Sequence, residues 1–590
     1  MSNQNWKRLA ISFLLLWIGI SCVAFAGMYK LWWGRERAEY LGKDAQVQRT
    51  VIWKKAGLSQ KLLEVLPEII QNWPDTVIYQ QKGNFNQLSY AGYLLLPRLP
   101  AKHRETSYIL SDDASYTMKY QEETVSENIV HSQPGIGGWL LSIFLVSGIV
   151  AGLKVIFRNT MLTIPEFFGL ASLIVTVVVT GTRAAGGSAI PAFYISGFSG
   201  AAGWLLALFY YWRTAFNFLR QHIANKKNMA SHLVFSRSNL LLFSCVLLIG
   251  ISVLWTLLMS VIVVPDDWDA WAIWGAKAKV LALGSGPLSD VTLFGHKDYP
   301  LLWPSIWAFS GFCSGGWEEM WSRGWGSVFF VLCLWEMGLV IQQETGKKYL
   351  AWTGAALFAS VPMAPVVVSW SYAEAPLWFL LLSSFGVLLR WKRQKSMSLL
   401  VVAALLALAA AYTKNDAMLC IVLMTFWLIM QKENHRLPAL AIFSVVFVIG
   451  YSPWFYWSRL VLDLHSHAAQ GLIITAESLH HAWDRIPGAA RKIVAMWLDA
   501  KQWSIVLWGA LVTWGLLIWQ AEDKATLLLP VFMILGYFTI VVFHHDDVYW
   551  LVGTAWNRLT LQVLPILITI LCVAFSRSVM EKGFVRQIYG

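Results

Sequence analysis

The chain is poor in charged residues and in cysteine for its length. Of 590 residues, 14% are Asp, Glu, Lys or Arg and 57% are hydrophobic, whereas a soluble protein of this size would carry more charge. The six cysteines lie mostly inside apolar runs, and this scatter indicates neither a disulfide framework nor a zinc site. Apolar runs recur along almost the whole length, so the sequence predicts a polytopic membrane protein.

Nucleotide-binding motifs are also missing. The sequence contains no Walker A motif and no Gly-x-Gly-x-x-Gly after a predicted strand. This argues against ATP as an energy source and against a nucleotide-sugar donor held on a Rossmann-like domain. We find no internal repeat of the kind that many transporters carry, which disfavours a transporter.

Positive charge is in excess but is dispersed. The formal net charge is +12, and no single face gathers it, so the sequence predicts no nucleic-acid partner. Lysine and arginine instead cluster in short loops between apolar runs, which marks those loops as cytoplasmic. These residues are Arg213, Arg220, Lys226, Lys227 and Arg237 in one loop, and Arg390, Lys392, Arg393 and Lys395 in another.

Hydropathy and loop charge predict about fourteen transmembrane helices. The predicted spans are residues 9–28, 136–157, 163–180, 189–212, 239–264, 323–342, 349–369, 373–390, 397–412, 417–430, 437–457, 502–519, 525–543 and 559–575. An even number of spans puts both termini in the cytoplasm. The sequence carries no eukaryotic retention signal, and we predict the bacterial inner membrane as its location.

Four regions follow from this topology. We predict an N-terminal transmembrane helix (1–29), an extracytoplasmic α/β domain (30–135), additional transmembrane helices with a basic cytoplasmic loop (136–238) and a catalytic transmembrane module (239–590). In the polar region we expect helices over 57–73 and 90–96, with strands over 76–80 and 107–110. The predicted fold class is an all-α polytopic membrane protein with a small α/β domain outside the membrane after the first helix.

An acidic cluster follows the apolar run 240–264. Asp266, Asp267 and Asp269 lie where a membrane helix ends, and carboxylates near lipid are costly enough to suggest a function. One interpretation is a general base that takes a proton from a hydroxyl. The other is helix capping, in which Asp266 or Asp267 caps a helix over 270–283. We expect function for at least one of the three and capping for at least one other.

Two further polar groups follow on the same side of the membrane. Lys277 and Lys279 either contact a phosphate or snorkel to the interface. His296, Asp298 and Tyr299 precede an apolar stretch broken by two prolines, a pattern that favours a non-helical or re-entrant entry to the membrane. His296 and Asp298 are candidates for orienting a substrate hydroxyl.

Three later segments add charge to that side. Glu374 opens a predicted span, where a helix N-terminus favours a carboxylate. Lys414, Asn415 and Asp416 lie between two spans, and Lys414 is placed to meet an anionic headgroup. Arg558 precedes the last predicted span, where a guanidinium can bind a phosphate through two N–H groups. The sequence thus predicts carboxylates that activate a hydroxyl, and cations that hold a phosphate, at one membrane face.

From about Leu240 onward the chain resembles the GT-C superfamily of membrane glycosyltransferases, and more closely the bacterial relatives of the protein O-mannosyltransferase and aminoarabinose-transferase group. The resemblance rests on the acidic motif 265–274, a His/Tyr-Pro motif at 296–300, the Tyr-Ala-Glu-Ala-Pro-Leu segment 372–377, a Thr-Lys motif at 413–416 and an Arg before a Leu-Pro span at 558–565. The chain departs from that group in its four additional spans and outer domain, in its Asp-Asp-Trp-Asp motif, and in Leu559 where relatives often have Tyr.

The resemblance implies a polyprenyl-phosphate sugar as donor, with inverting transfer to a hydroxyl of a lipid, glycan or protein on the extracytoplasmic face. Asp269 is the first choice for the base and Asp267 the second, with Asp266 left open. Lys414 and Arg558 would stabilise the departing phosphate, while His296, Asp298 and Glu374 would orient sugar or acceptor. Some relatives use a divalent cation, so a divalent cation is a possible cofactor. The sequence shows no dedicated set of metal ligands, and we therefore predict no defined metal site.

Two other functions would use the same charges. A transporter or flippase for a lipid-linked sugar would carry the headgroup without chemistry. An O-antigen ligase or polymerase would take a diphosphate-linked donor and typically relies on an Arg-rich late loop. The predicted outer loop 458–501 contains Arg459, Arg485 and Arg491, together with His465, His467, His480 and His481. For these histidines we favour a solvated loop.

Overall fold

The computed structural model describes residues 136–577 apart from 159, 226–236, 264, 266, 284–287, 292–294, 318, 432–434, 465–475, 520, 522 and 545. Before residue 136 it describes parts of one helix (17, 19–21, 23, 24 and 26) and four short strands. Side chains are described for these residues except for the strands, 212–225, 237–239 and 476–481.

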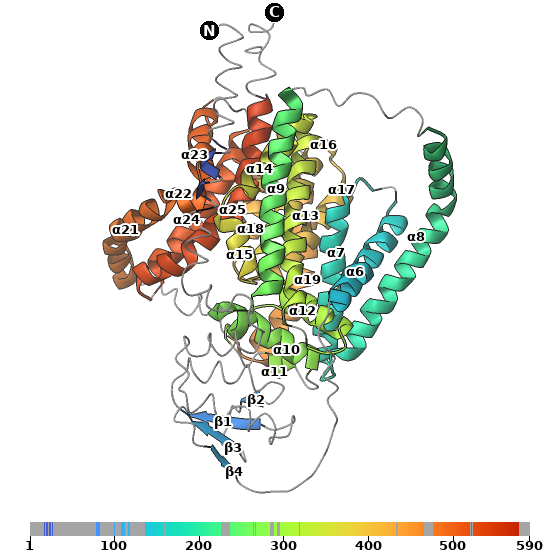
Figure 1. The fold of residues 1–590 in the computed structure, drawn as a ribbon. Coiled ribbons are helices and arrows are strands. Elements are labelled where there is room, and N and C mark those ends of the chain that lie inside the picture. The colour runs from blue at the N-terminus through green and yellow to red at the C-terminus, as the bar shows by residue number, and fades with distance from the viewer. Residues whose placement is uncertain are drawn as a thin grey trace, which may run out of the picture.

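The described chain from residue 136 onward is a helical bundle (Figure 1). Its first half comprises α6 (Ile136–Ile156), α7 (Ile164–Ala184), α8 (Ile190–Asn225), α9 (Arg237–Ile262), α10 (Ala276–Leu283), α11 (Leu288–Val291), α12 (Leu302–Cys313), α13 (Trp325–Thr345), α14 (Lys348–Ala359) and α15 (Met363–Ser369). Its second half comprises α16 (Glu374–Gln394), α17 (Met397–Ala411), α18 (Ala417–Met430), α19 (Arg436–Phe455), α21 (Ala476–Trp497), α22 (Ala500–Trp503), α23 (Val506–Leu517), α24 (Lys524–Phe543) and α25 (Val548–Phe575). Two π-helical segments, η2 (Ala270–Gly275) and η4 (Tyr456–Val461), and one 3₁₀ turn, η3 (Trp321–Gly324), interrupt the α-helices.

Among the described residues, eight helices are long and apolar enough to cross a bilayer, or nine if α14 and α15, which meet at a 63° bend, form one broken span. The protein is therefore a helical membrane protein. Each segment predicted as a span from residue 136 onward contains a helix. However, α17, α18 and α23 have 15, 14 and 12 residues, fewer than the roughly 20 that a bilayer requires, so the total of fourteen spans stays a prediction.

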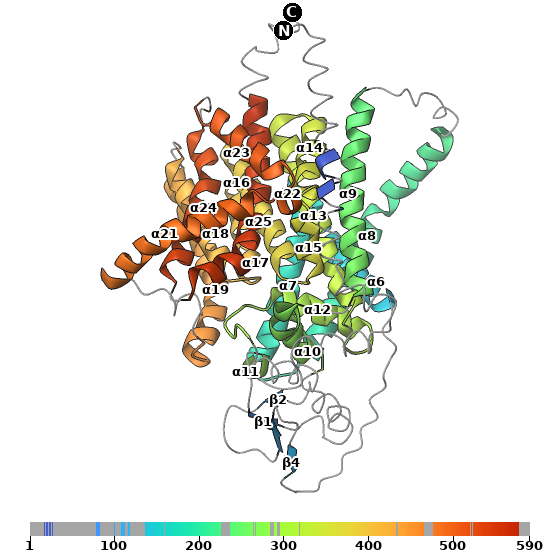
Figure 2. The ribbon, with the colours of Figure 1, turned by 60° about the vertical axis from the view of Figure 1, so that its left-hand side comes forward.

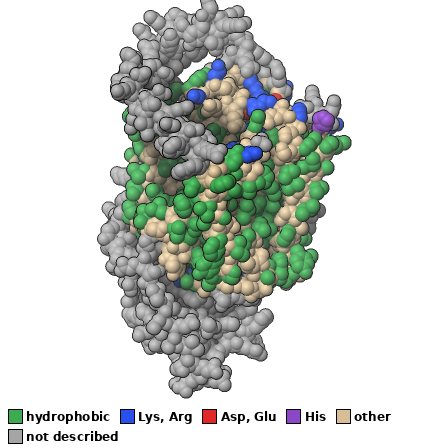
Figure 3. All heavy atoms as spheres, turned by 90° about the vertical axis from the view of Figure 1, so that its right-hand side faces the viewer, with side chains coloured by type: hydrophobic (Ala, Val, Ile, Leu, Met, Phe, Trp, Pro, Cys, Tyr) green, Lys and Arg blue, Asp and Glu red, His purple; other side chains and the backbone are tan. Residues whose placement is uncertain are grey.

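Helix α16 joins two chemically different ends of the bundle. Its 21 residues extend about 30 Å, which is close to the thickness of the hydrocarbon core. Glu374 lies in its first turn, while Lys392 and Arg393 lie in its last. At that last turn Lys392 pairs with Asp523 at 2.7 Å. Figure 3 shows lysine and arginine side chains gathered at one end of the molecule and a broad hydrophobic band beside them.

The helices before residue 239 pack against the rest of the bundle. A buried ion pair joins Glu166 in the first turn of α7 to Arg390 of α16, and Glu166 also completes a capping box with Thr163. The Thr163 hydroxyl donates to Glu336 of α13 at 2.8 Å. Removing one partner of such a buried pair leaves an uncompensated charge, so α7 is fixed to the bundle by polar as well as apolar contacts.

Helix α8 packs on α6 through glycine. A Cβ atom on Gly148 would lie 2.0 Å from the carbonyl oxygen of Gly200, so a larger residue there would push the two helices apart. Figure 2 shows α8 running away from the remaining helices beyond this contact.

A small sheet lies beyond α10 and α11, at the end of the bundle where those helices are found (Figure 1). It consists of β1 (Ile78–Lys82), β2 (Leu99–Pro100), β3 (Tyr108–Ser111) and β4 (Tyr116–Met118) in the order β2-β1-β3-β4. β1 pairs in parallel with β2 and β3, and β3 pairs antiparallel with β4. The strands predicted at 76–80 and 107–110 overlap β1 and β3, while the helices predicted at 57–73 and 90–96 lie outside the described residues. The α/β domain as a whole stays a prediction.

The prediction of a solvated loop over 458–501 is wrong in its second half. Helix α21 occupies 22 of these residues, and it packs against α24 and α25. Its apolar side chains recur on one face among many polar ones, so a hydropathy window does not detect it. Of the loop's histidines, 465 and 467 lie outside the described residues, and the side chains of His480 and His481 are not described.

Candidate functional site

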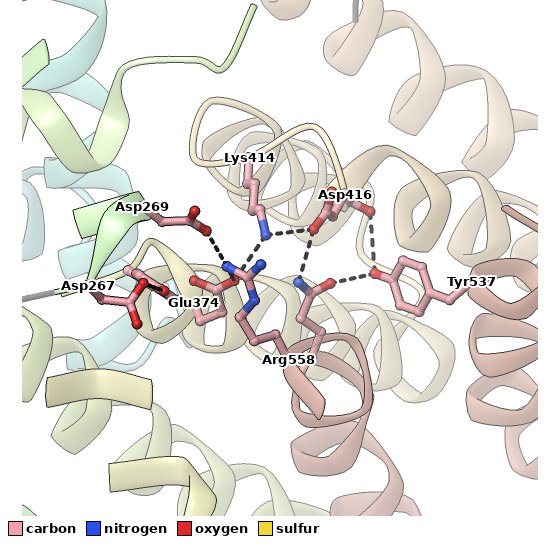
Figure 4. A network of polar contacts seen from close by, with 9 residues as sticks. Asp267, Asp269, Glu374, Lys414, Asp416, Tyr537 and Arg558 are labelled. Carbon is pink, nitrogen blue, oxygen red and sulfur yellow. Dashed lines mark hydrogen bonds and ion pairs between the residues drawn. The ribbon is translucent and has the colours of Figure 1, made fainter. Parts of the chain in front are cut away.

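Four segments that are distant in sequence meet in one polar network (Figure 4). Its charged members are Asp269, Glu374, Lys414, Asp416 and Arg558. They come from the turn before η2, from the start of α16, from the turn between α17 and α18, and from α25. The expectation that Arg558 precedes the last span is wrong, because α25 begins at Val548 and Arg558 lies inside it.

Arg558 lies between two carboxylates. Its guanidinium donates to Asp269 at 2.5 Å and lies 3.9 Å from Glu374. Ion pairing explains how an arginine is tolerated within a largely apolar helix, since a charge at membrane depth requires a partner. The Asp269 and Arg558 side chains are 21% and 17% exposed, so solvent still reaches this pair.

Lys414 is held by two carboxylates. Its ammonium lies 2.9 Å from Glu374 and 2.8 Å from Asp416. Burial lowers the pKa of Lys414, but Asp416 and Glu374 outweigh burial and hold that pKa above its ordinary value. Burial alone would raise the pKa of Asp416, but the positive charge of Lys414 has the larger effect and lowers this pKa below its ordinary value. The pair is therefore charged at neutral pH.

Tyr372 connects the second acidic candidate to this network. Its phenol donates a hydrogen bond to Asp267, and the Arg558 guanidinium lies 4.8 Å from the centre of its ring, a cation–π contact. Burial, together with the charges of Asp269 and Asp267, raises the pKa of Tyr372 well above its ordinary value. The phenol therefore stays protonated and acts as a donor.

The expected helix after the acidic cluster begins as a π-helix. Asp269 is the residue before η2 and makes no side-chain capping bond, whereas the Asp267 carboxylate accepts from Tyr372. Asp269 therefore does not cap η2, Asp266 lies outside the described residues, and capping by Asp266 or Asp267 stays a prediction. Single π-helical turns inside helices are frequent at functional sites.

A second polar cluster adjoins the network through residue 415. The Asn415 amide donates to the buried carboxylate of Asp298, and Arg459 of η4 lies 3.7 Å from the same carboxylate. Because Asn415 stands between Lys414 and Asp416 in the chain, Asp298 and the main network share one backbone turn. The structure thus unites two of the predicted motifs, at 296–300 and 413–416.

Lys277 supports the turn that carries Asp298. It is buried, and its ammonium donates to the carbonyl oxygens of His296 at 2.6 Å and Tyr299 at 3.1 Å. His296 has a φ of 45°, a conformation that non-glycine residues rarely adopt. The Tyr299 ring stacks on the His296 ring at 4.5 Å. Lys277 therefore fixes this turn and is not a surface lysine at the interface; Lys279 is half-buried.

Burial also governs titration at this turn. It lowers the pKa of Lys277 to about 7, with Asp298 opposing the shift. Burial likewise raises the pKa of Tyr299, helped by Asp416 and opposed by Lys414. Tyr299 therefore stays neutral, with the ammonium groups of Lys277 and Lys414 each 5.9 Å from its ring centre.

Arg323 holds together the two segments that carry the carboxylates. Its guanidinium donates to Ser371 Oγ at 3.1 Å, to the Ser260 carbonyl oxygen at 2.7 Å and to the Val263 carbonyl oxygen. Ser371 has a φ of 65°, which is costly for a residue with a side chain. These hydrogen bonds join the end of α9, which precedes Asp267, to the turn that precedes Tyr372.

Replacing Arg323 with methionine is expected to lower the free energy of unfolding by roughly 2–4 kcal/mol, because three buried acceptors lose their donor. The measurement is the thermal unfolding midpoint of the purified protein in detergent, with Arg323→Lys as the charge-retaining comparison. An unchanged midpoint for Arg323→Met would contradict this role.

The sequence reasoning did not select Gln562 or Tyr537, and it named Arg459 only as part of a predicted outer loop. Gln562 of α25 donates to Asp416 at 3.2 Å, and Tyr537 of α24 donates to Gln562 at 2.6 Å. Arg459 contacts Asp298, as described above. Each is a polar residue in or beside an apolar helix, and this placement in the sequence could have indicated a candidate site residue.

The residues could hold an anion more readily than a metal ion. Within the described part of the chain, no group of three or more His, Cys, Asp or Glu side chains is arranged to bind a metal ion. The carboxylates of the network are instead paired with Lys414 and Arg558, and both cations can bind a phosphate oxygen.

Comparisons with protein-family models, with curated proteins and with solved structures find no match to this chain.

Proposed function

We propose that the protein is an integral-membrane glycosyltransferase that moves a sugar from a polyprenyl-phosphate donor to an acceptor hydroxyl. The observation that supports this most is the joining of Asp269 to Arg558 and Lys414 through shared carboxylates. A displacement at an anomeric carbon needs a base for the incoming hydroxyl. It also needs positive charge for the departing phosphate, and the two lie side by side here.

The placement of the network supports an extracytoplasmic reaction. Glu374 lies at one end of α16, and Lys392 and Arg393 lie at the other. The sequence predicts that α16 is a span, and basic residues mark the cytoplasmic ends of membrane helices. We therefore infer that the network faces the opposite side. In a bacterial inner membrane, with fourteen spans and cytoplasmic termini, this is the periplasmic face, where lipids, glycans and exported proteins offer hydroxyl groups.

The reaction follows from these positions. Asp269 takes the proton from the acceptor hydroxyl, and the acceptor oxygen forms a bond to the anomeric carbon from the face opposite the phosphate. The bond between that carbon and the phosphate oxygen breaks, and its electron pair leaves with polyprenyl phosphate. Arg558 and Lys414 hold the negative charge that develops on the phosphate. Direct displacement inverts the configuration at the anomeric carbon.

The test is donor consumption by the purified protein in liposomes, across a panel of polyprenyl-phosphate and polyprenyl-diphosphate sugars. Release of polyprenyl phosphate from a monophosphate donor would support the proposal. Consumption of diphosphate donors alone would instead indicate a ligase or polymerase. Movement of a labelled donor across the bilayer without consumption would indicate a flippase.

Replacing Arg558 with glutamine is expected to lower the transfer rate about 10²–10³-fold, because the developing phosphate charge loses its donor. The measurement is the initial rate at saturating donor. Arg459→Gln, which lies in the neighbouring cluster, is the matched comparison and should affect the rate less. Equal transfer rates for Arg558→Gln and wild type would show that Arg558 does not stabilise the departing phosphate.

A further inference from the structure

We propose that the phosphate site is already filled by Asp269 when no substrate is bound, and that a phosphate enters by displacing this carboxylate from Arg558. The inference rests on the proposed function and adds how that site is controlled. It makes Asp269 a competitor of the phosphate before it becomes the base.

The geometry of the cations carries this inference. The Arg558 guanidinium donates to Asp269 at 2.5 Å and lies 3.9 Å from Glu374. Lys414 contacts Glu374 and Asp416 at 2.9 Å and 2.8 Å. Both cations are therefore paired with carboxylates, and a phosphate can take the N–H group of Arg558 that Asp269 holds only if that carboxylate moves away.

Asp269 is the carboxylate best placed to move. Its side chain is 21% exposed, whereas that of Glu374 is 1% exposed. It lies where α-helical and π-helical geometry meet and makes no capping bond. Glu374 sits in the first turn of α16, where the helix dipole also stabilises it.

The third carboxylate is more firmly held. Asp416 accepts from the Gln562 amide at 3.2 Å in addition to its contact with Lys414. Asp416 and Glu374 thus remain as counterions of Lys414, while Asp269 exchanges with the phosphate. Figure 4 shows Asp269 on one side of the Arg558 guanidinium and Asp416 on the other.

This exchange links the two halves of the reaction. While Asp269 is paired with Arg558 at 2.5 Å, the guanidinium holds the carboxylate oxygen that would take the acceptor proton. Binding of the donor phosphate to Arg558 releases the carboxylate beside the anomeric carbon. Donor binding therefore precedes activation of the acceptor.

The experiment measures the Kd of polyprenyl phosphate for the purified full-length protein in detergent, with uncharged polyprenol of the same chain length as the control ligand. Asp269→Asn removes the competing charge and is expected to bind polyprenyl phosphate about tenfold more tightly than wild type. The Asp269–Arg558 ion pair is partly exposed, so its strength lies between that of a surface ion pair and that of a buried one. Asp269→Glu keeps the charge and should bind as wild type does. Asp269→Ala is the second variant if Asp269→Asn does not fold.

Asp523→Asn is the matched control, because Asp523 pairs with a lysine at the opposite end of the bundle; its Kd should equal that of wild type. Tighter binding of polyprenyl phosphate, with unchanged binding of polyprenol, would support the exchange. Equal or weaker binding by both neutral variants would overturn it and leave the proposed function standing. Absence of phosphate-dependent binding in wild type would overturn both.

Discussion

Asp269→Asn is expected to lower the transfer rate about 10²–10⁴-fold, the range that general base catalysis supplies. Asparagine has nearly the same shape as aspartate, so it preserves packing at the turn before η2, but its amide cannot take the proton of the acceptor hydroxyl. The loss should appear in kcat. KM for the donor should not rise, because the variant lacks the carboxylate that competes for Arg558.

The comparison for this result is Asp267→Asn. Asp267 accepts a hydrogen bond from Tyr372, and an asparagine oxygen can accept the same bond, so we expect a smaller loss of rate. The measurement is the initial rate of labelled sugar transfer at saturating donor, with matched protein levels. If Asp267→Asn lost more of the transfer rate than Asp269→Asn, Asp267 and not Asp269 would be the general base.

Lys414→Met is expected to lower the free energy of unfolding by about 3–5 kcal/mol and to abolish transfer. Lys414 compensates Glu374 and Asp416 at 2.9 Å and 2.8 Å, and its removal leaves carboxylates without their cation in a buried site. The matched comparison is Lys392→Met, whose pair with Asp523 has side chains 28% exposed on both partners. A pair that solvent reaches in this way contributes about 0–1 kcal/mol.

The stability difference between wild type and Lys414→Met should be largest near neutral pH and should shrink as the pH falls, because without Lys414 burial raises the pKa of Asp416 in the variant. The pKa of Asp416 is lowered by folding, so its contribution is present above the unfolded value of about 3.9 and is lost as the pH falls through the folded pKa. The pKa of Lys414 is raised, so its contribution is present below about 10.4 and is lost only as the pH rises through the folded pKa. A stability difference that grows as the pH falls from 7 would contradict this assignment.

The sequence could indicate which motifs matter because membrane helices make charged residues conspicuous. Asp269, Glu374, Lys414, Asp416 and Arg558 were all selected for standing beside or within apolar runs, and the structure brings these five into one network. Their chemical roles stay predictions. The positions of the long helices followed from the same contrast between lipid-compatible and charged segments.

What the sequence could not show depended on contacts between distant residues. Arg558 was placed before its helix because an arginine is costly within lipid, and its partner Asp269 lies 289 positions away. Lys277 was weighed as a phosphate or interfacial lysine, but the carbonyl oxygens that hold it belong to a turn about twenty residues later. Helix α21 was missed because its apolar residues are confined to one face, so its average hydropathy resembles that of a loop.

The most direct test of the account is the configuration of the anomeric carbon in the transferred product, determined by NMR with the donor that the liposome panel identifies. If Asp269 acts as a base for direct displacement at a phosphate held by Arg558 and Lys414, the product has the opposite anomeric configuration to the donor. Retention of configuration would indicate a double displacement or a front-side attack and would contradict the account.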